Sequence, residues 1–235
     1  MYKRQVLNNI KFDVRENEFL CLVGPTGCGK TVLCGIIGGL VDPSLGEVTI
    51  DGNPVDNRAL NISFVFQEPS CLPWLTVREN IGVGLAIKGI TGSKADKRIK
   101  EIMEIVALQG FEKYYPSQIS GGMKQRVAIA RAFATDPDLL LMDEPFAHLD
   151  AQTRSYMQLE VRRIWGKLKK TVIFATNNIE EAMLLAERVI ILSRLPARII
   201  GEVPLDLPLD QRDVTSQAFL AKRKGISDLC EALLI

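Results

Sequence analysis

Short apolar runs alternate along the chain with segments of helical periodicity. The apolar runs have the length of buried strands and lie at residues 19–23, 48–50, 62–66, 139–142, 171–175 and 189–192. Elsewhere apolar residues recur at helical spacing, as with Met157, Val161 and Ile164, which fall on one helix face. Strands that alternate with helices are typical of an α/β fold with a mainly parallel sheet.

The middle of the chain has a different pattern. Ile99, Ile102 and Met103 recur at helical spacing, and strand-like runs are few between residues 68 and 134. We therefore expect one domain in which residues 1–67 and 135–210 form an α/β core, residues 68–134 form a helical subdomain, and residues 211–235 form a C-terminal tail.

Composition narrows the class of protein. The 235 residues are 47% hydrophobic and 24% charged, with a net charge of +1, as in an ordinary globular protein without a strong field for nucleic acid. The five cysteines are odd in number and form no C-x-x-C pair, which argues against a disulfide framework or a zinc site. No apolar run reaches the ~18 residues of a membrane span, so we expect a soluble or peripheral protein.

Residues 24–31 carry the clearest chemistry. They read Gly-Pro-Thr-Gly-Cys-Gly-Lys-Thr and fit the phosphate-binding pattern G-x-x-x-x-G-K-[ST], between a predicted strand and a predicted helix at 30–40. The glycines allow backbone N–H groups to curve around a polyanion. Lys30 supplies a cation for the β- and γ-phosphates, and the Thr31 hydroxyl suits Mg²⁺. The loop alone indicates a nucleoside triphosphate, which kinases, GTPases and motors also bind.

Two further motifs suit the same ligand. Asp143 and Glu144 close an apolar strand, at the sheet edge where parallel α/β proteins bind ligands, and they suit a Mg²⁺ ligand and a general base. Ser120 is a good helix N-cap, and Gly121 and Gly122 expose backbone N–H groups that could hold a γ-phosphate.

In order and spacing, these motifs resemble the nucleotide-binding subunit of an ATP-binding cassette (ABC) transporter nearly end to end. On this resemblance the chain carries a Walker A loop at 24–31, a Q-loop at Gln67, a signature at Ser120, Gly121 and Gly122, a Walker B strand at 139–143, and a D-loop at Leu149 and Asp150. The resemblance implies a P-loop NTPase core with a mainly parallel sheet, a small antiparallel β part at the N-terminus and a helical subdomain insertion.

The resemblance also assigns roles to residues, with ATP and Mg²⁺ as cofactors. The nucleotide-binding residues would be Tyr2, Gly24, Pro25, Thr26, Gly27, Cys28, Gly29, Lys30, Thr31, Ser120, Gly121 and Gly122. The Mg²⁺ ligands would be Thr31, Gln67 and Asp143. The catalytic set would be Glu144, Gln67 and the switch position, Asn177. Tyr2 would stack on adenine.

Partners follow from the same resemblance. Two cassettes, identical or different, would close head to tail around two ATP molecules, each held by one Walker A loop and the facing signature. Transmembrane permease subunits would receive the motion, with a solute-binding protein as an indirect partner and no nucleic acid. The subunit would then lie peripherally at the cytoplasmic face of the cell membrane.

Residues 72–77 and Met123 narrow the resemblance. The sequence Leu-Pro-Trp-Leu-Thr-Val after Gln67, with Met123 after the signature glycines, is similar to the nitrate, sulfonate and taurine importer group. This resemblance implies ATP-driven uptake of a small anion.

Asn177 departs from the family pattern. The family has a switch histidine in a Thr-His-Asp sequence, whereas this chain has Asn177 there and its one histidine, His148, in the D-loop. An amide can donate a hydrogen bond but cannot become cationic near neutral pH. We expect ATP binding with weak hydrolysis, which leaves a second interpretation open: a regulatory cassette that pairs with a competent ATPase subunit.

Other classes of P-loop protein fit less well. A cassette ATPase acting on DNA or ribosomes tends to carry two cassettes or a long coiled-coil insertion, and this sequence contains neither. A small-molecule kinase would lack the motif at residues 120–122.

Overall fold

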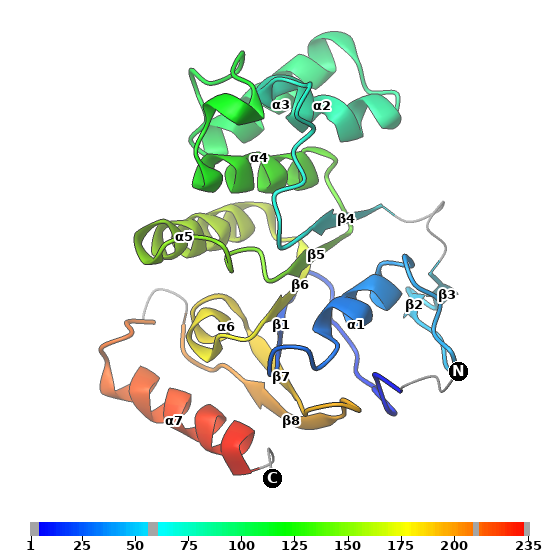
Figure 1. Cartoon of the computed structure of the whole chain (residues 1–235), viewed down its shortest axis with the longest axis vertical. Helices are drawn as coiled ribbons and strands as arrows, with labels where there is room; N and C mark the ends of the chain where they lie inside the picture. Colours follow the sequence, from blue (N-terminus) through cyan, green and yellow to red (C-terminus); the bar gives the residue numbers. More distant parts are fainter. Residues whose placement is uncertain (1–4, 56–60, 209–211, 233–235) are drawn as a thin grey trace. The chain divides into compact units, whose positions relative to one another are not determined.

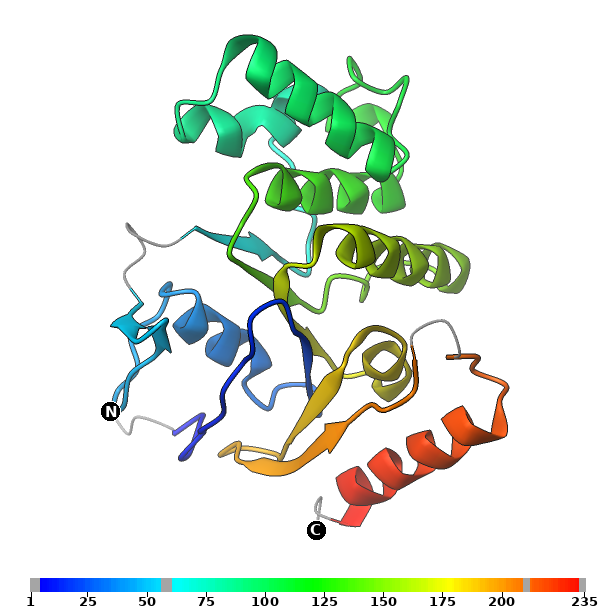
Figure 2. The same ribbon diagram turned by 180° about the vertical axis from the view of Figure 1, so that it is seen from behind.

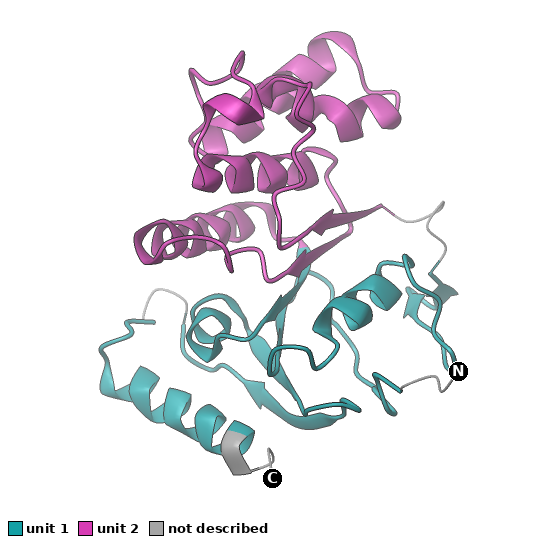
Figure 3. Ribbon diagram, viewed as in Figure 1, with its two compact units in different colours: residues 1–60, 171–235 teal, residues 61–170 magenta. Residues whose placement is uncertain are grey.

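The computed structural model describes residues 5–55, 61–208 and 212–232. The chain divides into two compact units, unit 1 with residues 1–60 and 171–235 and unit 2 with residues 61–170 (Figure 3). Each of the six apolar runs forms a strand, which confirms the α/β prediction. No helix within the described ranges combines the length and apolar character that a bilayer span requires.

Unit 1 is built on four neighbouring strands in the order β6-β1-β7-β8. These strands are β1 (Phe19–Val23), β6 (Thr171–Thr176), β7 (Arg188–Leu192) and β8 (Ile199–Pro204). β1 pairs in parallel with both β6 and β7, and every residue of β1 is buried. A strand with parallel neighbours on both sides is covered on both faces, which explains its unbroken apolar run.

Three helices belong to unit 1: α1 (Lys30–Ile37), α6 (Ile179–Leu185) and α7 (Gln217–Ala232). Figures 1 and 2 show α1 and α6 on opposite sides of the strands, with α7 beside α6. α1 ends earlier than the predicted 30–40 because Gly38 and Gly39 follow, and Gly39 has a φ of +65°. A small antiparallel pair, β2 (Thr49–Ile50) and β3 (Asn53–Pro54), completes the unit.

Two features of unit 1 were not predicted. β8 runs antiparallel to β7, and its Gly201 and Pro204 interrupt the apolar pattern. Pro204 lies at the end of an edge strand, where a missing N–H is tolerated. The segment expected as a tail at 211–235 contains helix α7.

Unit 2 contains the parallel pair β4 (Ile62–Val65) and β5 (Leu139–Asp143). Its helices are α2 (Val77–Ile87), α3 (Gly92–Ile105), the 3-10 turn η1 (Pro116–Gln118), α4 (Gly121–Ala134) and α5 (Ala151–Leu168). Residues 68–134, all of them described, form helices and loops without a strand. Unit 2 is longer than this helical stretch, because it also holds β4, β5 and α5.

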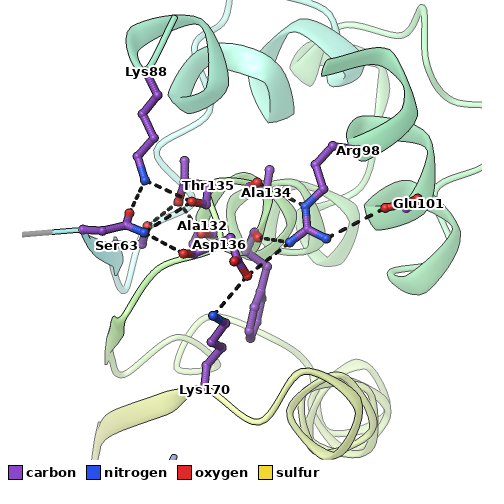
Figure 4. Close-up of polar contacts among 11 residues, drawn as sticks. Ser63, Lys88, Arg98, Glu101, Ala132, Ala134, Thr135, Asp136 and Lys170 are labelled. Carbon is purple, nitrogen blue, oxygen red and sulfur yellow. Dashed lines mark hydrogen bonds and ion pairs between the residues drawn. The ribbon is translucent and has the colours of Figure 1, made fainter. Parts of the chain in front are cut away.

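The C-terminal end of α4 is anchored by side chains from neighbouring segments (Figure 4). Arg98 donates hydrogen bonds to the carbonyls of Phe133 and Ala134, at 3.0 and 3.2 Å. Asp136 forms ion pairs with Arg98 at 3.7 Å and with Lys170 at 3.1 Å. The hydrogen bonds from Arg98 satisfy carbonyls that a helix end leaves without intrahelical partners, and the ion pairs of Asp136 hold the turn that follows.

Candidate nucleotide-binding site

The loop at residues 24–31 turns from β1 into α1 and has no room for extra side chains at two of its glycines. Gly29 has a φ of +107°, and a Cβ there would lie 2.7 Å from Val6 Cγ1. A Cβ on Gly24 would lie 2.8 Å from Cys28 Sγ. The curve of the loop is thus fixed by contacts within unit 1, and it has the form of a phosphate cradle.

Lys30 lies inside this curve. Its side chain is buried, and Nζ donates hydrogen bonds to the carbonyls of Gly24 at 2.9 Å and Pro25 at 3.2 Å. A buried ammonium needs such partners. The first turn of α1 begins at the same residue, so a cation and a positive helix end coincide there, which fits a polyphosphate ligand.

Asn177 contacts the loop directly. It is exposed just after β6, and its amide Nδ2 donates a hydrogen bond to Thr26 Oγ1 at 3.2 Å. The backbone around it is fixed, because Asn178 caps α6 and donates its own N–H to Thr176 Oγ1 at 3.0 Å. The structure therefore places the predicted switch position against the predicted phosphate loop. Tyr2, the predicted adenine-stacking residue, lies outside the described residues.

In unit 2, β5 delivers Asp143 and Glu144 to the end of a strand, as predicted. Asp143 is buried, and Glu144 is partly exposed. Glu144 has a φ of +42°, a left-handed conformation that costs a non-glycine residue roughly 1–2 kcal/mol.

The motif at residues 120–122 forms the start of α4. Ser120 Oγ accepts a hydrogen bond from the backbone N–H of Met123 at 3.3 Å, as predicted for an N-cap. Gly121 is exposed, and no described atom outside its immediate chain neighbours would lie within 4 Å of a Cβ placed there. This helix start is open to a ligand from outside the unit.

Gln67 follows β4 and begins a loop. This loop is held by hydrogen bonds that could not be predicted from the sequence. Asn80 of α2 is fully buried, and its amide donates to the carbonyls of Leu72 at 3.1 Å and Leu75 at 2.9 Å. Its oxygen accepts from the Leu72 N–H at 2.8 Å. The one sequence feature that indicates this role is a polar residue, Asn80, on the same buried helix face as Val77, Ile81 and Leu85.

Arg131 of α4 fastens the same loop at a second point. Its guanidinium donates to the Ser70 carbonyl and the Ser70 hydroxyl, both at 2.8 Å. Burial lowers the pKa of Arg131 from its ordinary value. Trp74 lies in the loop that Asn80 and Arg131 hold by hydrogen bonds. It is 69% exposed and presents an aromatic surface.

The N-terminus of α5 is capped by a side chain, as is that of α4. Asp150 Oδ1 accepts a hydrogen bond from the Thr153 N–H at 2.9 Å, and this bond lowers the pKa of Asp150 below its ordinary value. Arg154 donates to the carbonyl of Leu149 at 3.1 Å. His148 is exposed beside this anchored turn.

The predicted metal ligands have suitable chemistry. Thr31, Gln67 and Asp143 offer a hydroxyl, an amide and a carboxylate oxygen, the donor types that Mg²⁺ prefers. The described part of the chain contains no cluster of three or more His, Cys, Asp or Glu side chains placed to hold a metal.

A phosphate cradle after a parallel strand and a capped Ser-Gly-Gly helix start define a P-loop nucleotide-binding protein. The ABC transporter family model matches residues 7–147. The chain is 48% identical over 225 residues to an uncharacterized ABC transporter ATP-binding protein of Methanocaldococcus jannaschii, covering 96% of this chain and 84% of that protein. It therefore belongs to the ABC transporter family and is an ATP-binding subunit with the ABC cassette fold.

Two further similarities add detail. The chain is 46% identical over 222 residues to the aliphatic sulfonates import ATP-binding protein of Bacillus cereus, covering 94% of this chain and 87% of that protein. A dimeric ATP-binding cassette in a post-hydrolysis state, bound to ADP and phosphate, matches with a TM-score of 0.75 at 33% identity, covering 86% of this chain and 92% of that one. Cassettes of this family are ATPases.

Proposed function

We propose that this chain couples ATP binding and hydrolysis to the uptake of a small anion, with an aliphatic sulfonate as the first candidate and nitrate or taurine as the others. The similarity to the Bacillus cereus sulfonate importer subunit supports this proposal most directly. The motif at residues 72–77 supports the same importer group.

In this proposal, the phosphate loop and the start of α4 bind the nucleotide. Lys30 and the loop N–H groups bind the β- and γ-phosphates of ATP, and Ser120 with its two glycines holds the γ-phosphate bound to a second cassette. Glu144 orients and deprotonates the attacking water. Mg²⁺, held by Thr31, Gln67 and Asp143, would neutralise charge on the phosphates.

The partners we propose are a second cassette, identical or different, and transmembrane permease subunits, with a solute-binding protein acting through the permease. The subunit would lie at the cytoplasmic face of the cell membrane. Trp74, exposed on a loop that Asn80 and Arg131 fasten, offers a rigid aromatic contact for a permease segment.

Transport in proteoliposomes tests this proposal. The chain is reconstituted with candidate transmembrane permease subunits, and uptake of labelled alkanesulfonate, taurine and nitrate is measured with ATP. We expect sulfonate uptake that stops in the Glu144→Gln variant. Failure of all three anions to enter, despite ATP hydrolysis, would contradict the substrate class and leave the ATPase assignment intact.

A second candidate function is a cassette of low turnover that regulates a competent partner, and Asn177 favours it. An amide at this position lacks the charge-assisted hydrogen bond of a histidine, a contact worth about 1.5–3 kcal/mol, or about ten- to a hundredfold in rate. The amide of Asn177 also donates a hydrogen bond to Thr26, so this donor is already used within the chain.

The Asn177→His variant distinguishes the two functions. We expect its kcat for ATP to exceed that of the natural chain about tenfold, with ATP affinity little changed. The same kcat in both proteins would show that Asn177 supports full turnover and would remove the regulatory candidate.

A further inference from the structure

The starts of α4 and α5 meet at one point in unit 2, and that point lies inside the signature. A Cβ on Gly122 would lie 2.6 Å from the methyl carbon Cγ2 of Thr153, the second residue after the start of α5. Figures 1 and 2 both show α4 and α5 side by side. A second contact joins the helices, because the Arg126 guanidinium lies 4.5 Å from the centre of the Tyr156 ring.

The two signature glycines therefore differ in what limits them. Gly121 faces open space within the described chain, with no neighbouring atom within 4 Å of an added Cβ. A Cβ added to Gly122 would lie closer to Thr153 Cγ2 than real Cβ atoms lie to their neighbours. Only the second glycine is required by the packing of its own chain.

Thr153 also holds the D-loop. Its backbone N–H donates to Asp150 Oδ1, which fixes the turn before α5, while Ser120 fixes the turn before α4 through Met123. The side chain that faces the signature thus belongs to the residue whose backbone N–H is bound by the N-cap Asp150. The methyl group of Thr153 therefore lies against the backbone of Gly122.

We propose that Thr153 is a positioning residue that seats the signature helix start against the D-loop, so that both loops of one subunit move together. The role in turnover rests on the proposed function of residues 120–122 in holding the nucleotide of the second cassette. The packing itself does not depend on that function.

A suppressor pair tests the proposal. Gly122→Ala should push the two helix starts apart, because the added carbon would lie 2.6 Å from Thr153 Cγ2, a methyl group on a short β-branched side chain with restricted rotamers. Thr153→Ser removes only the clashing methyl, since Thr153 Cβ and Oγ1 both lie 3.9 Å from the added carbon. We expect Gly122→Ala to lower kcat about tenfold or more and to lower the melting temperature, and the double variant to recover to within about threefold in kcat.

Gly121→Ala is the matched control. Thr153 does not face this position, so Thr153→Ser should leave any defect of Gly121→Ala uncorrected. ATP binding to the isolated subunit should stay unchanged in all variants, because the Walker A cradle lies in unit 1. A loss of kcat with unchanged ATP binding, restored when the contacting methyl of Thr153 is deleted, would tie turnover to the relative placement of the two helix starts.

The outcomes separate the two claims. Normal stability and kcat in Gly122→Ala, or failure of Thr153→Ser to restore either, overturns the proposal. Restored melting temperature without restored kcat also overturns the positioning role and leaves only packing. If none of the proteins hydrolyses ATP, the proposed function fails, and ATP-dependent dimer formation in a Glu144→Gln background then decides the positioning role by the same rescue.

Discussion

Gly24 and Gly29 of the Walker A loop are crowded by their own unit, whereas Gly121 of the signature is open, and this difference separates a closed site from an open one. In the Walker A loop, Gly24 and Gly29 are required by atoms of the same unit, and Lys30 already has its hydrogen-bond partners there. In the signature, Gly121 faces open space and Ser120 is exposed. The cradle is complete within its unit, whereas the signature presents a surface for something outside it.

The largest expected effect separates hydrolysis from binding. Glu144→Gln removes the proposed general base, and we expect kcat for ATP to fall about 10³-fold, while Gly24 to Thr31 still bind ATP normally. Single-turnover hydrolysis and equilibrium binding of ATP measure the two quantities. Parallel loss of binding would show that the two units do not divide these tasks.

Gly29→Ala should disable the cradle. The substitution combines a φ of +107° with a 2.7 Å contact to Val6 Cγ1, so we expect ATP affinity to fall about a hundredfold, measured by calorimetry. Val6→Ala relieves the contact but not the backbone conformation, so it should restore little. Full rescue by Val6→Ala would show that contact alone governs the loop, as we propose for Gly122.

Asn80→Leu should loosen the loop that follows Gln67. The change leaves carbonyls of Leu72 and Leu75 without their donor, and we expect the free energy of unfolding to fall by about 2–3 kcal/mol. Denaturant unfolding measures this loss, and hydrogen exchange should rise in residues 68–76. Asn53→Leu, at an exposed asparagine of unit 1, is the control and should have little effect.

The smallest expected effect is an acid sensitivity of unit 1. Burial alone raises the pKa of Glu18, but hydrogen bonds and charge from Arg188, at 2.6 and 2.8 Å, outweigh it, and the net pKa lies below its ordinary value. A lowered pKa stabilises the fold above the pKa of the unfolded chain, and this stability is lost as pH falls through the folded value.

Glu18→Gln should therefore reduce the acid-induced loss of melting temperature by about 2–4 °C, which is about 1 kcal/mol for a chain of this size. Thermal melts from pH 7 to pH 3 check this. Glu202→Gln is the control, because Glu202 pairs with the same Arg188 but is half-exposed, and its effect should be smaller. An equal effect of both changes would contradict the role of burial.

Short sequence patterns predicted those parts of the structure that are determined by residues adjacent in the sequence. The strand β1, the cradle after it and the N-cap at Ser120 each follow from a few adjacent positions, and the structure has them. β8 escaped prediction because Gly201 and Pro204 weaken the apolar alternation of an edge strand.

Long-range contacts of the candidate site could not be predicted. The hydrogen bond from Asn177 to Thr26 joins residues 151 positions apart, and that from Arg131 to Ser70 spans 61. Thr153 has no sequence feature that indicates a contact with Gly122. The left-handed backbone of Glu144 likewise depends on tertiary packing, because glutamate does not favour that conformation.

Cys28 has a chemical consequence for the cradle. Its thiol is buried with 1% exposure and lies against the backbone of Gly24. An alkylating reagent can reach this sulfur only when the loop opens, and the adduct would then prevent the loop from closing again. The rate of alkylation therefore measures how often the empty cradle opens, and bound ATP should slow it in proportion to occupancy.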